Sequence, residues 1–418
     1  MNRMRNGLLQ ILLVVFLTAF FLASSAWAKD AGPIKIGFIA PLSGPLAQLG
    51  KDAENGAKLY LNEIGHKMAG RKVEMIIGDT EGAAAKSLSK TKKAVEMDKV
   101  DIILGPISGV SGAAILPYIN SRGIPTVFPV YALDDLTQRK RSQWIVRTAW
   151  TSSQTSYPFA EYCYNVLGYR KVAFFASDYQ FSYELVGGFQ RVFEELGGTC
   201  PQRIYAPYTC LDFNPYIPQL DRNVDAIYLM WAGKQSMQFL KQYQAAGLKG
   251  RIQLIGTGVV TDENSLPRMG DEALGIITSL HYSTALQNPE NLEFQKKFKK
   301  LAGKISGYYG ESYYTGAKWF HAAVEALKGD LRDKKKLMGA LRNVKITCPR
   351  GPMKLDAYGS PIQNVYIRKV ERVNGELQNT VVKTYENVSQ FWKWKPEEYL
   401  KEPIYSRNYP PLGHYKKK

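Results

Sequence analysis

Small and hydroxyl-bearing residues fill two glycine-rich segments of the chain, and each segment follows a short apolar run. The first segment covers residues 41–50 and includes Leu49, and the second covers residues 105–112 and includes Ser108 and Gly109. The small hydroxyl residues of the second segment lie where a predicted helix begins, and unpaired backbone N–H groups there can bind a carboxylate or a carbonyl oxygen. Ser108 can equally cap that helix, so the sequence leaves both roles open.

Known catalytic and nucleotide-binding motifs are missing from these segments. No G-x-G-x-x-G follows a strand, no G-x-x-x-x-G-K-[ST] occurs anywhere, and the G-x-S-x-G spacing of a serine hydrolase is absent. No histidine or carboxylate pair faces a nucleophile in the predicted loops. The four histidines, at positions 66, 281, 321 and 414, lack the spacing of metal ligands. The sequence therefore predicts no cofactor, no metal site and no enzyme activity.

Four aromatic residues fall where predicted strands end and loops begin. They are Tyr131, Tyr179, Phe181 and Trp231. The carboxyl ends of parallel strands meet at one edge of a sheet, so we expect these rings to gather at the same end of the sheets. Placed there, they would form an apolar cleft on which a planar ligand can stack.

The segments that must position these residues alternate between short apolar runs and amphipathic helical stretches. Runs such as 172–176 and 227–231 are apolar without interruption, which is typical of parallel strands covered by helices on both faces. The alternation restarts after Gln154, and 418 residues are too many for one core. We therefore expect two doubly wound α/β lobes. Strands are predicted at 34–40, 73–78, 102–105, 124–129, 144–148, 171–177, 204–208, 226–231, 252–256 and 275–280, with helices from about 48 and at 84–97, 112–121, 157–167, 181–196, 234–246, 292–302, 313–327 and 334–343.

After Gly351 the alternation of strands and helices gives way to a pattern of β-hairpin segments. Residues 365–373 and 380–385, joined through Asn374-Gly375, have the pattern of a β-hairpin. The segment from Phe391 onward is rich in Trp, Tyr, Pro and Lys without periodicity, and we expect an extended arm laid over the surface. The predicted division is 29–150 with 275–349 for lobe 1, 151–274 with 350–385 for lobe 2, and 386–418 for a C-terminal extension.

The first 28 residues are typical of a secretory signal peptide. Arg3 and Arg5 precede an apolar run over residues 8–21, and Ala26-Trp27-Ala28 forms a cleavage site. The run is short for an uncleaved membrane anchor. No cysteine follows it for lipid attachment. We expect the mature chain to begin at Lys29 and to lie free in the periplasm.

The expected export predicts how the cysteines pair, and the net charge indicates which class of ligand or partner the protein can bind. An oxidising compartment favours disulfides, and among four cysteines we expect Cys200 and Cys210 to pair across a strand that returns on itself. The 55 Lys and Arg against 37 Asp and Glu give a net charge of +18. The lysines cluster on predicted helices as solvated faces, and the exported location argues against a nucleic-acid partner. A positive field can instead concentrate an anionic ligand.

Several short motifs, in order and at similar spacing, resemble the branched-chain amino acid binding proteins of bacterial ABC importers. They are IGFIAPLSG at 36–44, ILGP at 103–106, GIPT at 123–126, DAIY at 225–228 and AAGL at 245–248. This resemblance to type I periplasmic binding proteins implies two Rossmann-like lobes joined by three crossings, near Trp150, Leu274 and Arg350. It also implies closure on a small ligand, a membrane permease with ATPases as partner, a monomeric protein and no chemistry.

The resemblance also implies a set of ligand contacts. In the family a carboxylate group is held by the stretches that correspond to Ser108-Gly109 and Tyr131-Ala132, and an ammonium group by an acid in the loop that here contains Thr257 and Gly258. The expected ligand-binding residues are Leu49, Ser108, Gly109, Tyr131, Ala132, Tyr179, Phe181, Trp231, Thr257 and Gly258.

The predicted ligand follows from what this loop lacks. No acid stands between Gly256 and Val259, and an unpaired ammonium in a closed cleft costs several kcal/mol. We therefore expect a hydrophobic or aromatic carboxylate without an amine. Two alternatives stay open: the ligand is an amino acid held by other residues, such as Asp262 or Glu263, or the protein senses a ligand for a separate receptor.

Overall fold

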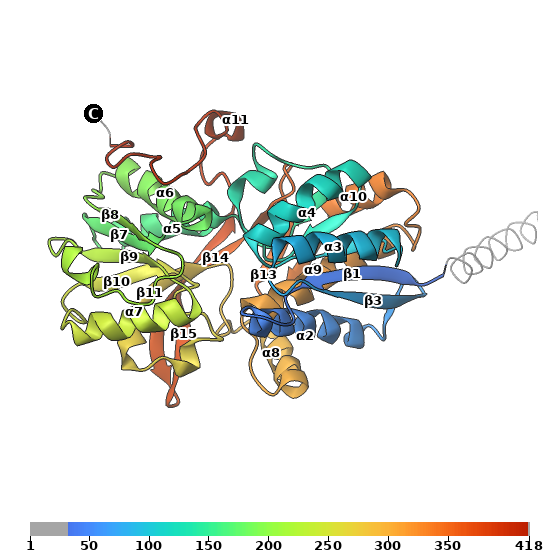
Figure 1. The fold of residues 1–418 in the computed structure, drawn as a ribbon, viewed down its shortest axis with the longest axis horizontal. Helices are drawn as coiled ribbons and strands as arrows, with labels where there is room; N and C mark the ends of the chain where they lie inside the picture. The colour runs from blue at the N-terminus through green and yellow to red at the C-terminus, as the bar shows by residue number, and fades with distance from the viewer. Residues whose placement is uncertain (1–31, 417–418) are drawn as a thin grey trace, which may run out of the picture.

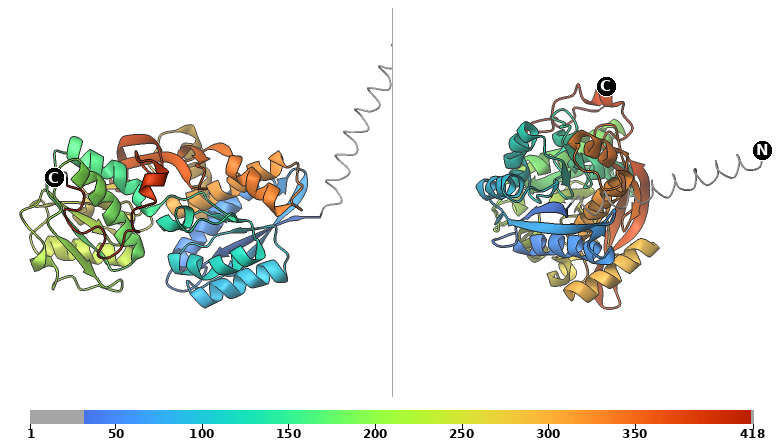
Figure 2. Two further views of the ribbon diagram at one scale, coloured as in Figure 1. Left: turned by 90° about the horizontal axis from the view of Figure 1, so that it is seen from above. Right: turned by 90° about the vertical axis from the view of Figure 1, so that its right-hand side faces the viewer.

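Two α/β lobes lie side by side in the computed structural model, which describes residues 32–416 (Figure 1). Each lobe has its own sheet, and the long hairpin strand β14 (Pro361–Val373) belongs to the sheet of lobe 2. Figure 2 shows the same arrangement from above and from one end. The predicted signal peptide and the cleavage before Lys29 lie outside the described residues. No helix within residues 32–416 is long and apolar enough to cross a membrane.

Lobe 1 is built on a six-stranded sheet with the order β2-β3-β1-β4-β5-β6, parallel except for the short β2. The strands are β1 (Ile34–Ala40), β2 (Lys67–Met68), β3 (Arg71–Asp79), β4 (Ile102–Leu104), β5 (Thr126–Phe128) and β6 (Ile145–Arg147). One face packs against α2 (Ala47–Glu63), α8 (Pro289–Ala302), α9 (Tyr308–Ala326) and α10 (Lys334–Asn343). The other face is covered by α3 (Ala84–Glu96) and α4 (Gly109–Arg122).

Lobe 2 is built on a nine-stranded sheet in which β8-β7-β9-β10-β11 are parallel and β14 and β15 are antiparallel. The strands are β7 (Val172–Ser177), β8 (Arg203–Ala206), β9 (Ala226–Met230), β10 (Gln253–Thr257), β11 (Ile277–Leu280), β12 (Lys345–Cys348), β13 (Gly351–Leu355), β14 and β15 (Glu376–Val388). The helices are α5 (Ser152–Asn165), α6 (Gln180–Glu195), α7 (Gly233–Ala245) and α11 (Pro396–Tyr399), with short 3-10 turns at Asp134–Thr137, Ile217–Gln219, Leu266–Arg268 and Asp271–Ala273.

Adjacent residues of the central strands face opposite helical layers, as the uninterrupted apolar runs predict. In β7, Phe174 packs against Phe189 of α6, whereas Phe175 packs against Phe239 of α7. Neither phenylalanine is exposed. Because side chains alternate along a strand, helices on both faces leave no position for a polar residue there. The predicted fold class, two doubly wound lobes, is confirmed.

The chain passes between the lobes three times, and the second and third crossings lie several residues beyond the predicted positions near Leu274 and Arg350. The first follows β6 and the third lies between β13 and β14. The second was expected near Leu274, but residues 277–280 form β11, which pairs with β10 in the sheet of lobe 2. The chain therefore leaves lobe 2 after Leu280. Strands β12 and β13 contribute Cys348 and Met353 to the core of lobe 1.

The C-terminal residues complete lobe 2. Strands β14 and β15 form the predicted hairpin, with positive φ at Asn374 and Gly375 as a two-residue turn of the I′ type requires. The segment beyond it follows α5 and α6, as Figure 2 shows, but it is more than a surface arm. Phe391, Tyr399 and Tyr405 are buried in the core of lobe 2. Their aromatic character, rather than any periodicity, was the signal of this burial.

The predicted disulfide between Cys200 and Cys210 is wrong. The two cysteines flank β8, which runs parallel to β7 instead of folding back, and all four thiols are free. The four residues of β8 alone extend about 13 Å at roughly 3.3 Å per residue. A disulfide needs Cα atoms within about 7 Å of each other. The short spacing in sequence therefore corresponds to a long spacing in space.

The native protein is expected to react at one thiol. Cys163, Cys200 and Cys348 are buried, whereas Cys210 is partly exposed. Burial raises the pKa of all four thiols, including that of Cys210, so access rather than thiolate fraction favours Cys210. Counting thiols with a chromogenic disulfide should give one rapid equivalent, absent in Cys210→Ser, and four equivalents in urea. Fewer than four in urea would indicate a disulfide.

Candidate ligand-binding site

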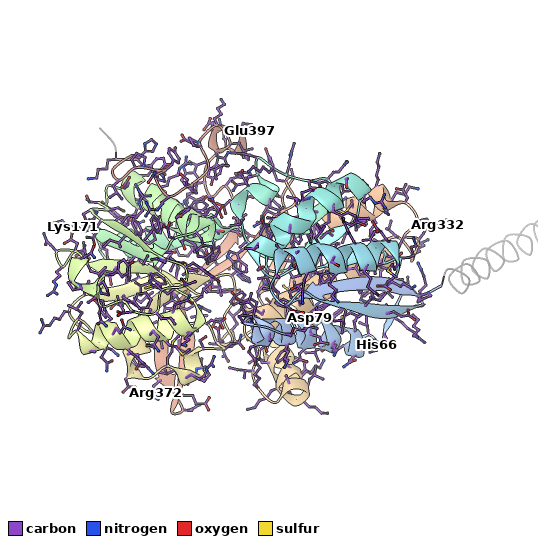
Figure 3. The ribbon with its side chains drawn as sticks, viewed as in Figure 1. His66, Asp79, Lys171, Arg332, Arg372 and Glu397 are labelled. Carbon is purple, nitrogen blue, oxygen red and sulfur yellow. The ribbon has the colours of Figure 1, made fainter. Side chains whose placement is uncertain are left out.

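The carboxyl ends of both parallel sheets face the other lobe. Figure 3 shows Asp79, the last residue of β3, nearer to lobe 2 than His66, which precedes that strand. In lobe 2, Lys171 directly precedes β7 and lies at the outer end of the molecule. Loops that follow the strands of the two lobes therefore meet between them, where doubly wound folds bind their ligands.

The first turn of α4 carries Ser108 and Gly109. The Ser108 hydroxyl caps the helix by accepting from the Ser111 N–H at 3.2 Å, and it donates to the Ser111 hydroxyl at 2.9 Å. The Tyr131 ring lies on this turn, because a Cβ at Gly109 would lie 3.4 Å from it and one at Gly112 3.0 Å. The capping role of Ser108 is therefore present, and the two glycines are the residues that admit the ring.

Tyr131, Ala132 and Leu49 lie at the same edge of lobe 1. Tyr131 is only 5% exposed and packs edge-to-face on Phe128, and burial raises the pKa of its hydroxyl to about 12. The Ala132 carbonyl accepts from the backbone N–H and the hydroxyl of Ser152, which begins the first helix of lobe 2. Leu49 lies in the first turn of α2 and packs on the core of lobe 1.

Tyr179 and Phe181 come from the start of α6 in lobe 2. The Tyr179 ring packs edge-to-face on Tyr208 at 5.0 Å and lies 6.0 Å from Phe181. Phe181 is partly buried and contacts the hydrophobic cores of both lobes. The structure therefore brings these two rings to the interface between the lobes, where the loop positions predict them.

Trp231 is a correction to the predicted site. Its indole is 1% exposed and packs at 4.8 Å from Phe213 and 5.1 Å from Phe175, inside the core of lobe 2. Ile227 and Leu229 precede it on the same side of β9 and belong to the same core. The two-residue period of the strand continues through Trp231 and turns it toward α7. Its position at the end of the run was therefore a poor guide to its direction.

The loop that follows β10 packs against an arginine of β14 at the place where the family resemblance implies an acid. A Cβ on Gly258 would lie 2.4 Å from a guanidinium nitrogen of Arg368 and 2.6 Å from Leu280. Arg368 comes from β14 and donates to the Gly258 carbonyl at 2.9 Å and to Glu263 at 2.9 Å. Thr257, beside it, is fully buried. Position 258 therefore cannot carry a side chain unless Arg368 moves.

Two acids follow this loop, and their situations differ. Glu263 pairs with Arg368 and also accepts from Asn379 at 3.2 Å. Asp262 is 5% exposed, accepts from the Asn264 N–H, and leaves Oδ2 without a hydrogen-bond partner among residues 32–416. Burial, reinforced by the charge of Glu263, raises the pKa of Asp262 to about 7. A large share of this carboxyl is therefore protonated at neutral pH.

An aromatic group at the crossings was not predicted from the sequence. We call Trp150, His281 and Tyr308 the hinge aromatic group. Trp150 lies on the first crossing and stacks on His281 of the second at 4.3 Å, with ring planes 22° apart. Tyr308, at the start of α9, packs edge-to-face on Trp150 at 5.4 Å and lies 4.0 Å from the Tyr309 ring. These residues are far apart in sequence, so no local pattern marks them.

A lysine connects the lobes beside this group. Lys304, just before α9 in lobe 1, pairs with Asp52 of α2 and donates to the Asn264 side chain of lobe 2 at 2.9 Å. Asp52 is fully buried. Burial raises the pKa of Asp52, while Lys304 acts in the opposite direction. The contact holds the two lobes together on the side of Asp262.

Two lobes with three crossings and facing carboxyl edges define the architecture, and sequence comparison agrees with it. The family model described as periplasmic binding protein matches residues 33–376. The chain belongs to this family. Within the part of this periplasmic binding protein that the structure describes, no three His, Cys, Asp or Glu residues are placed to hold a metal ion.

Relatives of this binding protein include both curated sequences and solved structures. A Leu/Ile/Val-binding protein homolog from Brucella melitensis is 30% identical over 378 residues, covering 88% of this chain and 95% of the relative. A solute binding protein of an ABC transporter from Rhodopseudomonas palustris, in complex with 3,4-dihydroxy benzoic acid, is 32% identical with a TM-score of 0.81 and coverage of 86% and 98%. Another from R. palustris, in complex with benzoate, is 27% identical with a TM-score of 0.78 and coverage of 86% and 98%.

Proposed function

We propose that this protein is the extracytoplasmic substrate-binding protein of an ABC importer and that it captures an aromatic carboxylate between its lobes. It delivers the ligand to a membrane permease driven by ATPases, acts in the periplasm and performs no chemistry on the ligand. The relatives that are ABC transporter substrate-binding proteins support this role.

The observation that carries the ligand class is the pair Gly258 and Arg368. In place of an acid that would hold an α-ammonium group, the loop after β10 presents a buried guanidinium. Glu263, the acid beside this guanidinium, is already paired with it, so an ammonium at this position would be desolvated with no acid of residues 256–259 to hold it, which is unfavourable by several kcal/mol. A carboxylate ligand without an amine avoids this unfavourable contribution to the binding free energy.

The two ends of the proposed ligand have different partners. At lobe 1 the carboxylate accepts from the N–H groups of the first turn of α4 and from Ser108, where the helix dipole favours an anion. Tyr179 and Phe181 of lobe 2 supply faces for the aromatic ring. Closure of the lobes then removes both ends of the ligand from water.

An amino-acid ligand is the second candidate, and one observation favours it. Asp262 has an oxygen without a partner among the described residues, and this oxygen would accept from an ammonium group. The curated relatives named for leucine, isoleucine and valine agree with this alternative. The two candidates differ in whether an amine is required.

Calorimetric titration with matched ligands separates the candidates. We expect benzoate and hydroxybenzoates to bind, and leucine and phenylalanine not to bind, because phenylalanine adds an amine to an aromatic carboxylate. Ligand at 100 times its Kd should stabilise the folded protein by about 2.7 kcal/mol, which a thermal shift detects independently. Binding of leucine or phenylalanine with no binding of benzoates would establish the amino-acid alternative.

A further inference from the structure

Three polar atoms of the hinge aromatic group lack hydrogen-bond partners. They are Nε1 of Trp150 and both ring nitrogens of His281, and no described residue reaches them. Trp150 is 2% exposed and His281 is not exposed. An unpaired buried polar atom is destabilising, and native proteins contain few of them. Other buried polar atoms of the described residues also lack partners, Nε1 of Trp231 among them, but the three here belong to two stacked rings on the crossings between the lobes.

These atoms belong to the crossings rather than to the interior of a lobe. Trp150 and His281 stand on the first two crossings, and Tyr308 connects them to Tyr309. Asp262 lies close enough for its charge to raise the pKa of both tyrosine hydroxyls, and Tyr179 of lobe 2 raises the pKa of Tyr308. The hinge aromatic group therefore continues into the set of rings that lies between the lobes.

His281 is neutral in this setting. Burial lowers the pKa of its imidazole well below the usual value, and the positive charges of Arg350 and Arg368 lower it further. A neutral imidazole has one N–H donor and one nitrogen acceptor, and the indole of Trp150 adds one donor. A carboxylate would meet the lone pair of the imidazole with its own negative charge. A hydroxyl group donates one hydrogen bond and also accepts, so it suits both the acceptor nitrogen of the imidazole and a neighbouring N–H donor.

We propose that Trp150 and His281 bind a ring hydroxyl of the ligand, so that the protein selects hydroxylated aromatic carboxylates over benzoate. This inference rests on the proposed function and names its ligand more narrowly. The phenolic hydroxyl donates to the free nitrogen of His281 and accepts from the indole N–H of Trp150. Benzoate would bury the same rings and leave these atoms unpaired, which is the situation in which sites reject an analogue that lacks a hydroxyl.

The test compares benzoate with 3-hydroxybenzoate and 4-hydroxybenzoate by calorimetry. For the wild-type protein we expect at least one hydroxybenzoate to bind about tenfold to hundredfold more tightly than benzoate. His281→Phe keeps the stacked ring and removes both nitrogens, and it should reduce this ratio to about twofold or less. Trp150→Phe removes the indole N–H together with part of the stacked ring and should lower the ratio partly. His321→Phe, a change at a half-buried histidine of α9 that contacts Tyr60 and lies outside the hinge aromatic group, is the matched control and should keep the wild-type ratio.

Each result is decisive. Equal binding of benzoate and both hydroxybenzoates by the wild-type protein overturns the inference without any variant and leaves the proposed function intact. A wild-type ratio retained in His281→Phe also overturns it. If His281→Phe does not fold, the wild-type ratio and Trp150→Phe still provide the answer. Failure of all three benzoates to bind the wild-type protein contradicts the proposed function itself.

Discussion

Replacing Arg350 with methionine is expected to lower the free energy of unfolding by about 3 to 5 kcal/mol, because it leaves the buried carboxylate of Glu311 without its partner. Neither side chain is exposed. The Arg350 Nε donates to both oxygens of Glu311, at 3.0 and 2.9 Å. The other nitrogens donate to the Thr148 carbonyl at 2.9 Å and to the Ser312 hydroxyl at 2.8 Å.

This arginine joins three parts of the molecule. It stands between β12 and β13, Thr148 follows β6 on the first crossing, and Glu311 lies in α9 of lobe 1. Its removal therefore affects the connection between the lobes as well as one ion pair. The loss should appear in urea denaturation monitored by circular dichroism, as a lower midpoint at an unchanged slope.

The double variant Arg350→Met with Glu311→Leu tests the mechanism. With both charges removed, no buried charge is left alone, so we expect it to be more stable than Arg350→Met. Lys72→Met breaks an exposed pair with Glu74 and should change the stability by no more than about 1 kcal/mol. If the double variant is less stable than Arg350→Met, the unpaired carboxylate is not the cause.

The fold could be predicted because its signals are local. The apolar run in β7 and the amphipathic stretch of α6 each follow from packing on neighbouring layers, and this packing fixes the period of the sequence. Asn374-Gly375 marks a hairpin by an equally local signal, because a two-residue turn requires positive φ at both positions and Asn and Gly tolerate it. The elements and the two lobes follow from such signals.

The site could be predicted only in part. Loop position correctly brings Tyr179 and Phe181 to the interface between the lobes, because the carboxyl edges of both sheets face each other. The direction of Trp231 depends on the strand period, which the loop argument ignored. Arg368 and His281 act through contacts with residues about 110 and 130 positions away, at Gly258 and Trp150. Such contacts exist only once the crossings are folded, and no local pattern encodes them.

The contribution of Asp262 to the stability of the protein is expected to fall as the pH rises from about 4 to 7, and Asp262→Asn should remove this contribution from the pH profile. Burial raises the pKa of Asp262 to about 7 from an ordinary value of 3.8. In this range the folded chain keeps a proton that the unfolded chain has lost. The stabilisation is thus fully present below pH 3.8 and is lost as the pH rises through 7, by about 1.4 kcal/mol per pH unit.

Urea denaturation at half-unit intervals from pH 4 to 8 measures this slope. Burial also raises the pKa of Asp134, to about 6, and that of Glu184 well above its usual value, so Asp262→Asn should change the slope without abolishing the pH dependence. Asp79→Asn is the control. Hydrogen bonds from Ser43, Glu81 and Leu42 lower the pKa of Asp79 to about 2, so its stabilisation is lost only as the pH falls below 3.8 toward 2. Equal slopes for the wild-type protein and Asp262→Asn would contradict the prediction.

The same carboxyl connects this pH dependence to the ligand class. An ammonium group bound at Asp262 would require the carboxylate form, and an amino-acid ligand would therefore release a proton near pH 6. A hydroxylated aromatic carboxylate held by Ser108, Trp150 and His281 makes no such demand, so its binding should release no proton from Asp262. Titrations in two buffers with different ionisation enthalpies measure proton release directly. Equal binding enthalpies in the two buffers, with an unchanged result in Asp262→Asn, are expected for the proposed ligand.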